Sequence, residues 1–471
     1  MAVELETSAI FETAKKIGNS PGSPYFILTV EIKAGGKDIV PLQILRHDIG
    51  RRYVDSYQDN TSLVVSMGMG TLMNEISPFQ DDLKLTLNIS QCDEYAAQLT
   101  NLPVFSRTFK AYLGDDIPRA SEAGNSPVME DTETANRSTI LHVRFILEEV
   151  AVEQLRKFPV GINARGVPPF MVMQTLLVKA CQALKLGKDE VITNFDLVEP
   201  NNTAGRDHVI IKDGTCILDV PDIIQNTQGG IYSTGLGFYI QGRCVYTWPM
   251  YDVYRQDTAK RVLQIVLAPS KYSRMLDRTW MDQGRMITIY SAGVSKVIDD
   301  SLGKLNTEGN GVRFAAAGKL LEGFATVAGN KATVSRSANN NEYTTAIVGN
   351  GQNLAPVSGQ KVSSNIYLET SKLAKRNGAI MIVPWRRSNP ELLTPGMAVE
   401  ILYDYKGVIR TIEGSFLESM NSYELDGEGM NVDRWTANTS LRIFIDRNDP
   451  DYIDFLKDGG QLSASPDIGS I

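Results

Sequence analysis

Residues 394–424 contain a complete β-hairpin pattern, which constrains the possible folds more than any other part of the sequence. A Pro395-Gly396 turn leads into apolar residues at alternate positions, and a Lys406-Gly407 reversal leads into a second such run. Alternation of this kind is typical of a strand with one buried face. The same alternation occurs over 25–33, 81–90, 105–113 and 138–147. We therefore predict an α+β fold in which antiparallel β-sheet predominates.

The 471 residues exceed what one hydrophobic core usually serves, so we expect more than one domain. The composition, 42% hydrophobic and 22% charged, lies near the globular average and excludes a disordered chain. No apolar run approaches the roughly 20 residues that cross a bilayer. Residues 1–16 are acidic and amphipathic, unlike a secretory signal. We therefore expect no direct membrane span and no export by a signal of this chain.

The residue types that most often act in catalysis or metal binding, cysteine and histidine, are scattered along the chain. The cysteines form no Cys-x-x-Cys pair, which favours reduced thiols over a metal site. Asp207-His208 lacks a placed nucleophile, and the adjacent Glu148 and Glu149 diverge, so neither pair supports hydrolysis. We predict no catalytic residues, no metal site and no cofactor. The cysteines and histidines behind this prediction are Cys92, Cys181, Cys216, Cys244, His47, His142 and His208.

The charge balance argues against a protein that binds nucleic acid through its phosphates. The chain has 55 acidic and 47 basic residues, a net charge of −8, and no basic stripe that could displace counterions from phosphates. An acidic surface weakly repels DNA over a Debye length. We predict no specific nucleic-acid binding, and we note that such a surface suits a conduit through which DNA slides.

Two central segments differ from the alternating strands. An apolar stretch between Pro169 and Gly187 has no helix breaker, which predicts a helix over 170–186 that is buried on most sides. Residues 229–252 predict two strands around a Gln241-Gly242-Arg243 reversal and are rich in aromatic residues. The aromatic residues form either a domain core or an interface for a peptide or sugar. The candidate interface residues are Tyr232, Phe238, Tyr239, Trp248, Tyr251 and Tyr254.

The order of these segments, together with three stretches of sequence, resembles the baseplate hub proteins of tailed bacteriophages. The stretches are VPDIIQNTQGGIYSTGLGFYIQGRCVYTWPMYD (220–252), TPGMAVEILYDYKGVIRTIEGSFLESMNSYEL (394–425) and TSLRIFID (439–446). The resemblance implies two tail-tube-like β-barrels plus smaller mixed α/β domains. It also implies a homotrimeric ring that adapts a sixfold tail tube to a threefold central spike and forms part of the DNA channel.

Mapped onto this chain, the resemblance and the composition predict the following domains. The first tube-like barrel covers 1–160, with a long exposed loop at 115–137 that is either an arm to a neighbouring subunit or a surface loop. A mixed α/β domain covers 161–284. The second barrel combines 285–298 with 379–450, around a loosely structured insertion at 299–378, and 451–471 form a tail.

The implied partners are further copies of the chain, the tail tube protein and the central spike protein, with tape-measure and baseplate wedge proteins as additional contacts. The implied location is the tail baseplate of the virion, and the host cytoplasm during assembly. Two other functions stay open at this point: a tail-associated cell-wall hydrolase, and a carbohydrate- or peptide-binding tail module that uses the aromatic residues of 232–254.

Overall fold

A computed structural model describes residues 12–99, 105–114, 140–187, 190–267, 278–298, 365–406, 408–426 and 434–457, together with four short strands between 312 and 347. Strands dominate these residues, and most of them join one large, mainly antiparallel sheet. The prediction of an α+β chain with predominant antiparallel sheet is confirmed. Among the described residues, no helix is both long and apolar enough to cross a membrane.

Eight of the described strands pair in a closed circuit, which we call the strand circuit. Following the hydrogen bonds, the order is β23-β3-β4-β7-β6-β5-β1-β24, and β24 pairs again with β23. All of these pairings are antiparallel. The strands are β1 (Tyr25–Ala34), β3 (Gln43–Arg52), β4 (Asn60–Gly68), β5 (Lys84–Cys92), β6 (Phe105–Leu113), β7 (Ile140–Glu149), β23 (Val408–Leu425) and β24 (Trp435–Asp446).

The alternating sequence pattern explains the core of the strand circuit. On β5, every second residue is buried, and the residues between them are half-buried. On β1, every second residue is likewise buried, and the residues between them are half-buried or exposed. Fully or almost fully buried side chains from this face include Leu83, Leu85, Leu87, Ile89, Phe26, Leu28, Val30 and Ile32. Additional elements near the strand circuit are β2 (Lys37–Ile39), α2 (Met69–Thr71), η1 (Leu72–Ile76), η2 (Ser77–Asp82) and α4 (Val150–Arg156).

The second part of the large sheet, which we call the second sheet, surrounds its own core. It consists of β13 (Val262–Leu267), β14 (Trp280–Asp282), β15 (Met286–Ser291), β16 (Lys296–Ile298), β21 (Gly378–Trp385) and β22 (Ala398–Tyr405), with parts of β23 and β24. The predicted hairpin is present: β22 pairs with β23 from Ala398 opposite Ser415 to Tyr405 opposite Val408. The alternating residues Met397, Val399, Ile401 and Tyr403 are buried.

Strands β23 and β24 belong to both the strand circuit and the second sheet. The first half of β23 pairs with β22, and the half after Leu417 pairs with β3. A shift of register between Phe416 and Glu418 marks a β-bulge, which bends a strand and changes the face that its side chains occupy. Phe416 therefore packs in the core of the second sheet, whereas Tyr423 packs in the core of the circuit.

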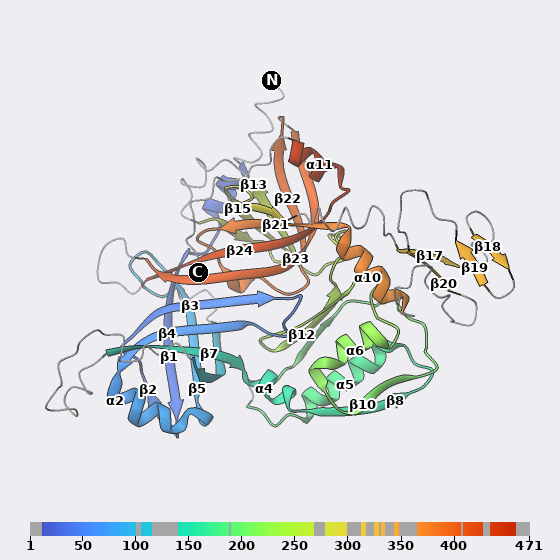
Figure 1. The fold of residues 1–471 in the computed structure, drawn as a ribbon. Helices are drawn as coiled ribbons and strands as arrows, with labels where there is room; N and C mark the ends of the chain where they lie inside the picture. The colour runs from blue at the N-terminus through green and yellow to red at the C-terminus, as the bar shows by residue number, and fades with distance from the viewer. Residues whose placement is uncertain are drawn as a thin grey trace, which may run out of the picture.

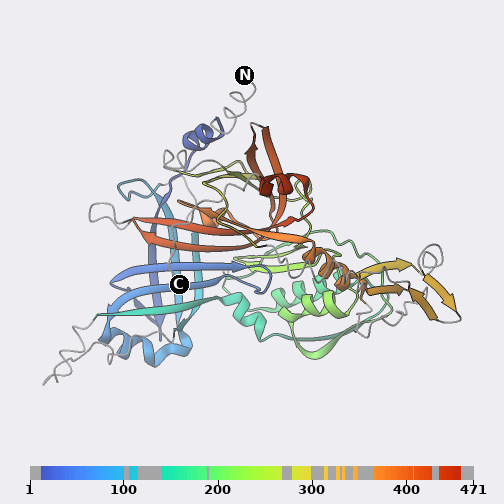
Figure 2. The same cartoon turned by 45° about the horizontal axis from the view of Figure 1, so that its top comes forward.

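The third part, the mixed region, lies beside the strand circuit (Figure 1). It contains β8 (Pro159–Ala164), α5 (Pro169–Ala183), β9 (Asn194–Leu197), β10 (Val209–Cys216), η3 (Ile217–Asp219), α6 (Val220–Thr227), β11 (Leu236–Gln241) and β12 (Cys244–Pro249). β11 and β12 form the predicted hairpin around Gly242, whose φ of +59° favours glycine. Figure 2 shows β23 and β24 running between the second sheet and the strand circuit.

Helix α5 is shorter and less enclosed than predicted. It ends at Ala183, and one of its faces is open: Met171 is 51% exposed, and Thr175 and Lys179 are also exposed. Leu177, on the opposite face, is fully buried in the core that α5 shares with α6. The prediction of burial on most sides was wrong because the core covers one side of this helix only.

Three predicted boundaries differ from the structure. Strand β13, predicted to lie in the mixed domain, pairs in parallel with β15 and β22 of the second sheet. The predicted tail begins with helix α11 (Pro450–Lys457), because Tyr452 and Phe455 are spaced to enter the core together and are each 1% exposed. The predicted loose insertion ends in helix α10 (Ile366–Arg376), which contacts α6.

Other parts of the insertion and of the N-terminus are also described. The four short strands pair as β17 (Val312–Ala316) with β20 (Tyr343–Ile347), and as β18 (Ala325–Ala328) with β19 (Lys331–Val334). Residues 12–19 are helical, and Ala14 and Ile17 pack against β13, β14 and β15. The predicted loop at 115–137 and residues 458–471 lie outside the described residues.

Candidate functional site: a buried polar joint

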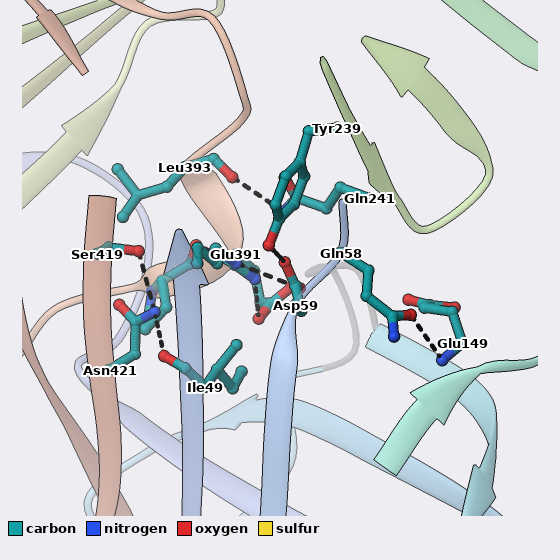
Figure 3. A network of polar contacts seen from close by, with 12 residues as sticks. Ile49, Gln58, Asp59, Glu149, Tyr239, Gln241, Glu391, Leu393, Ser419 and Asn421 are labelled. Carbon is teal, nitrogen blue, oxygen red and sulfur yellow. Dashed lines mark hydrogen bonds and ion pairs between the residues drawn. The ribbon is translucent and has the colours of Figure 1, made fainter. Parts of the chain in front are cut away.

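A buried cluster of charged side chains lies where the three parts of the chain meet, and we call it the joint. It consists of Arg51, Asp59, Arg107, Glu149, Tyr239 and Glu391. Arg51 and Asp59 flank the connection from β3 to β4 in the strand circuit, and Tyr239 belongs to β11 of the mixed region. Glu391 lies in η4 (Pro390–Leu392), which precedes β22 of the second sheet. Figure 3 shows Tyr239 and Glu391 approaching Asp59 from different segments.

Arg51 is the centre of the joint and is fully buried. Its Nε lies 3.3 Å from Asp59 Oδ2, and its Nη2 lies 3.2 Å from Glu391 Oε1. Its Nη1 donates to the carbonyl oxygen of Pro390. Burial alone would lower the pKa of Arg51, but the carboxylates of Asp59 and Glu391 more than reverse this effect, so the pKa is raised. The guanidinium therefore stays charged and holds the circuit against the second sheet.

Asp59 connects the mixed region to the same cluster. The hydroxyl of Tyr239 donates to Asp59 Oδ1 over 2.9 Å, and Arg107 Nη1 lies 3.7 Å from Asp59 Oδ2. Arg107 Nη1 also lies 3.0 Å from Glu149 Oε1. Desolvation by burial raises the pKa of Glu149 to about 7, although the neighbouring Arg107 acts in the opposite direction.

Further hydrogen bonds fix the β11–β12 hairpin around the joint. The backbone N–H of Ile240 donates to the carbonyl oxygen of Tyr57 over 2.7 Å. Gln241 Nε2 donates to the carbonyl oxygen of Leu393 over 3.1 Å, and Figure 3 shows this contact beside Tyr239. The hydroxyl of Tyr57 also donates to Asp219 of η3 over 3.1 Å, which adds a bond between the strand circuit and another part of the mixed region. One hairpin thus contacts both the circuit and the segment that leads into the second sheet.

A second polar cluster lies where β23 and β24 are shared. Asn421 Nδ2 donates to the carbonyl oxygen of Ile49 over 3.0 Å and to Ser419 Oγ over 3.1 Å. Thr439 Oγ1 donates to Asn421 Oδ1 over 2.9 Å and lies 2.7 Å from Ser388 Oγ. Because buried polar groups are costly unless paired, this network specifies how the two shared strands align.

His47 lies on the inward face of β3, four residues before Arg51 and on the same face. It is fully buried, its Nδ1 lies 3.2 Å from the carbonyl oxygen of Ser62, and its ring stacks on Tyr423 with centroids 5.2 Å apart. Burial lowers the pKa of His47 from 6.5 to about 4, although the Ser62 carbonyl group and Asp48 act in the opposite direction. This histidine is neutral at physiological pH and part of the core.

We expect His47 to make the protein less stable in acid. The unfolded chain binds the histidine proton between pH 6.5 and 4 while the folded chain does not, so this contribution to stability falls as pH falls through that window. The expected loss between pH 6.5 and 4.5 is about 2 kcal/mol. His47→Phe keeps a stacked ring and should lose this dependence. Urea unfolding of both proteins at the two pH values measures it, and an equal pH dependence in both would contradict the assignment.

The aromatic residues predicted as an interface are mostly internal. Tyr232 and Tyr239 are fully buried, Trp248 is 1% exposed and Phe238 is 7% exposed. Tyr251 is half-buried, and Tyr254 alone of the six is clearly exposed, at 61%. Four of the six candidate side chains therefore lie inside the chain, and both faces of β11 are covered. Tyr239, for example, packs against Tyr53, and the two rings meet edge to face with centroids 4.7 Å apart.

The other residues weighed in the sequence do not converge. Cys92 and Cys181 are buried, and Cys216 and Cys244 are half-buried free thiols. His142 and His208 are exposed on β7 and before β10. Glu148 and Glu149 do diverge: Glu148 contacts Arg156, whereas Glu149 contacts Arg107. Within the described residues, no group of three or more potential ligands could hold a metal ion.

Comparisons with known proteins give structural neighbours only. No protein-family model matches the chain. No curated protein matches it either. The chain is similar to the crystal structure of a tail protein from Neisseria meningitidis MC58, with 12% identity, a TM-score of 0.42, and coverage of 88% of this chain and 96% of that one. It is similar to a 43 kDa tail protein of prophage MuSo2 from Shewanella oneidensis, with 9% identity, a TM-score of 0.43, and coverage of 88% and 98%.

A third structural neighbour is a secretion-system protein. It is an E. coli component of the type VI secretion system, described as structurally similar to bacteriophage T4 tail proteins, with 10% identity, a TM-score of 0.36, and coverage of 89% of this chain and 77% of that one.

Proposed function

We propose that this chain is the structural baseplate hub of a bacteriophage tail. In this proposal, three copies form a ring that adapts the sixfold tail tube to a threefold central spike and forms part of the DNA channel. The observation that carries the proposal is the closed strand circuit fused, through β23 and β24, to a second sheet with its own core.

The strand circuit supports the first tube-like barrel of the proposal. A sheet that closes on itself has no free edge for unwanted pairing, and its inward residues fill one core. The second sheet supports the second barrel, because β15, next to one end of its strand order, contacts β21, next to the other end. Ser291 Oγ, at the end of β15, donates to the carbonyl oxygen of Pro384 in β21 over 2.7 Å.

Two such barrels in each chain would explain the change of symmetry. Three copies would present six similar units to the tube on one face, while the whole ring keeps the threefold symmetry that a trimeric spike requires. The joint and the shared strands would hold the two units of each chain at a fixed angle, which this arrangement needs. The proposed partners are therefore the tail tube protein, the spike protein and further copies of the chain.

We propose further that the chain is not an enzyme and that its channel face is neutral or acidic. The scattered histidines and cysteines and the net charge of −8 support these two points. The proposed location is the baseplate of the virion tail, after assembly in the host cytoplasm. Tape-measure and baseplate wedge proteins are proposed as further contacts.

Native mass spectrometry of the purified protein, alone and mixed with its spike protein, tests the trimer. The proposal expects three copies, either alone or in the complex with the spike. Six copies in one ring would favour a tube or collar component instead. Peptidoglycan and DNA serve as negative controls, since the proposal expects neither turnover of the first nor binding of the second at physiological salt.

A further inference from the structure

The joint contains one more acidic group than basic groups. Its acidic residues are Asp59, Glu149 and Glu391, and its basic residues are Arg51 and Arg107. Arg51 is fully buried, Asp59 is 4% exposed and Glu149 is 8% exposed. An uncompensated charge in such surroundings is unfavourable, and a bound proton removes it. Among the described residues, no group of three or more potential ligands could hold a metal ion. A proton is therefore the cation that we consider here.

The hydrogen-bond partners indicate which carboxyl group takes the proton. Asp59 interacts with Arg51, Arg107 and Tyr239, and Glu391 interacts with Arg51 at the more exposed side of the joint. Glu149 has a single cation, Arg107, which it shares with Asp59. It is therefore the buried carboxyl group with the weakest compensation.

We propose that Glu149 carries a proton within the joint near neutral pH, and that release of this proton loosens the attachment of the mixed region to the strand circuit. The inference concerns the joint of the single chain and does not rest on the hub assignment. The charged and titratable groups around Glu149 come from every element packed there: Arg107 on β6, Arg51 and Asp59 beside β3 and β4, Tyr239 and Tyr246 on β11 and β12, Glu391 in η4, and Glu148 with its partner Arg156.

The geometry explains why proton release would act on the mixed region. Arg107 lies under the β11–β12 turn, with Nη2 only 3.1 Å from the position that a Cβ atom would take at Gly242. The backbone N–H of Gly242 also donates a hydrogen bond to the Glu149 carboxyl group, and this bond lowers the pKa by less than burial raises it. An ionised Glu149 would compete with Asp59 for Arg107 and repel Asp59, the residue that holds Tyr239 of the hairpin. Proton release thus weakens the contact that anchors β11.

The sign of the effect follows from the pKa of Glu149. Burial raises it from 4.5 to about 7, so the folded chain holds this proton between pH 4.5 and 7 while an opened joint releases it. The closed joint is therefore favoured at low pH and loses this advantage as pH rises through 7. From these two values, local opening should become about 30-fold more favourable between pH 5.5 and pH 8.5.

Hydrogen exchange of residues 236–249, corrected for the intrinsic effect of pH on exchange, tests this inference. In the wild-type protein, opening of the hairpin should increase about 30-fold between pH 5.5 and pH 8.5. In Glu149→Gln, which resembles the protonated form, opening should stay constant. Glu31→Gln, on the exposed side of β1, is the matched control and should behave like the wild type. A flat wild-type profile, or an equal slope in Glu149→Gln, would overturn the proposal.

A second measurement covers the case in which Glu149→Gln does not fold. The wild-type protein with ¹³C-labelled glutamate carboxyl groups can be titrated by NMR. A carboxyl resonance that titrates with a midpoint between pH 6 and 8 and responds to Arg107→Met supports the proposal. If no glutamate titrates in that range, Glu149 holds no proton near neutral pH and the proposal is wrong.

Discussion

Replacing Arg51 with methionine is expected to lower the free energy of unfolding by about 3 to 5 kcal/mol. Methionine fills much of the space of the arginine stem but leaves Asp59 and Glu391 without the cation that lies 3.3 and 3.2 Å away. Because Arg51 is fully buried, water cannot take its place without disturbing the joint. Urea unfolding measures the change, and we also expect the mixed region to be cleaved more readily by a protease.

The neighbouring residue offers a matched control. Arg52 is on the opposite face of the same strand, its side chain is 48% exposed, and it interacts with Glu418 over 3.5 Å. Arg52→Met should cost less than about 1 kcal/mol, as exposed ion pairs usually do. If the two substitutions cost the same, Arg51 does not hold the three parts of the chain together.

The second large effect is expected for Leu177→Asp in helix α5. Leu177 is fully buried among the side chains of the mixed region, so the substitution places an unpaired carboxylate in an apolar core. We expect a loss of about 4 kcal/mol or more, seen as insoluble protein or as a large fall in the melting temperature.

The open face of α5 provides the comparison. Thr175 is exposed on the same helix, so Thr175→Asp should change stability by no more than about 0.5 kcal/mol. Near-wild-type melting of Leu177→Asp would show that α5 packs differently from the arrangement described above.

The individual strands could be predicted from the sequence, because alternation is a local property. The hairpin of β22 and β23 and the alternation of β5 follow directly from residues two positions apart. The sharing of β23 and β24 could not be predicted in the same way. It depends on pairs such as Tyr423 opposite His47, far apart in the sequence, and on a bulge at Leu417 that no local pattern marks.

One signal of the joint was present in the sequence. His47, Ile49 and Arg51 occupy one face of β3, and an arginine among buried neighbours predicts a buried charge that needs partners. Its partners could not be identified this way, since Glu391 is 340 residues away from Arg51 and Tyr239 is 180 residues away from Asp59.

For the aromatic residues of the mixed region, the sequence could not separate buried from exposed side chains. Both faces of β11 are buried, so alternation does not separate core from surface there. Composition alone made a core and a binding groove look alike, and only the packing of Tyr239 and Trp248 against Tyr53 separates them.

Electron microscopy of assembled tails, with the chain labelled, tests the hub function. We predict a ring at the distal end of the tail tube, between tube and spike, with three copies of the chain in each particle. Six copies in the ring would make the chain a tube or collar component, and a position on the tail fibres would contradict the hub function altogether.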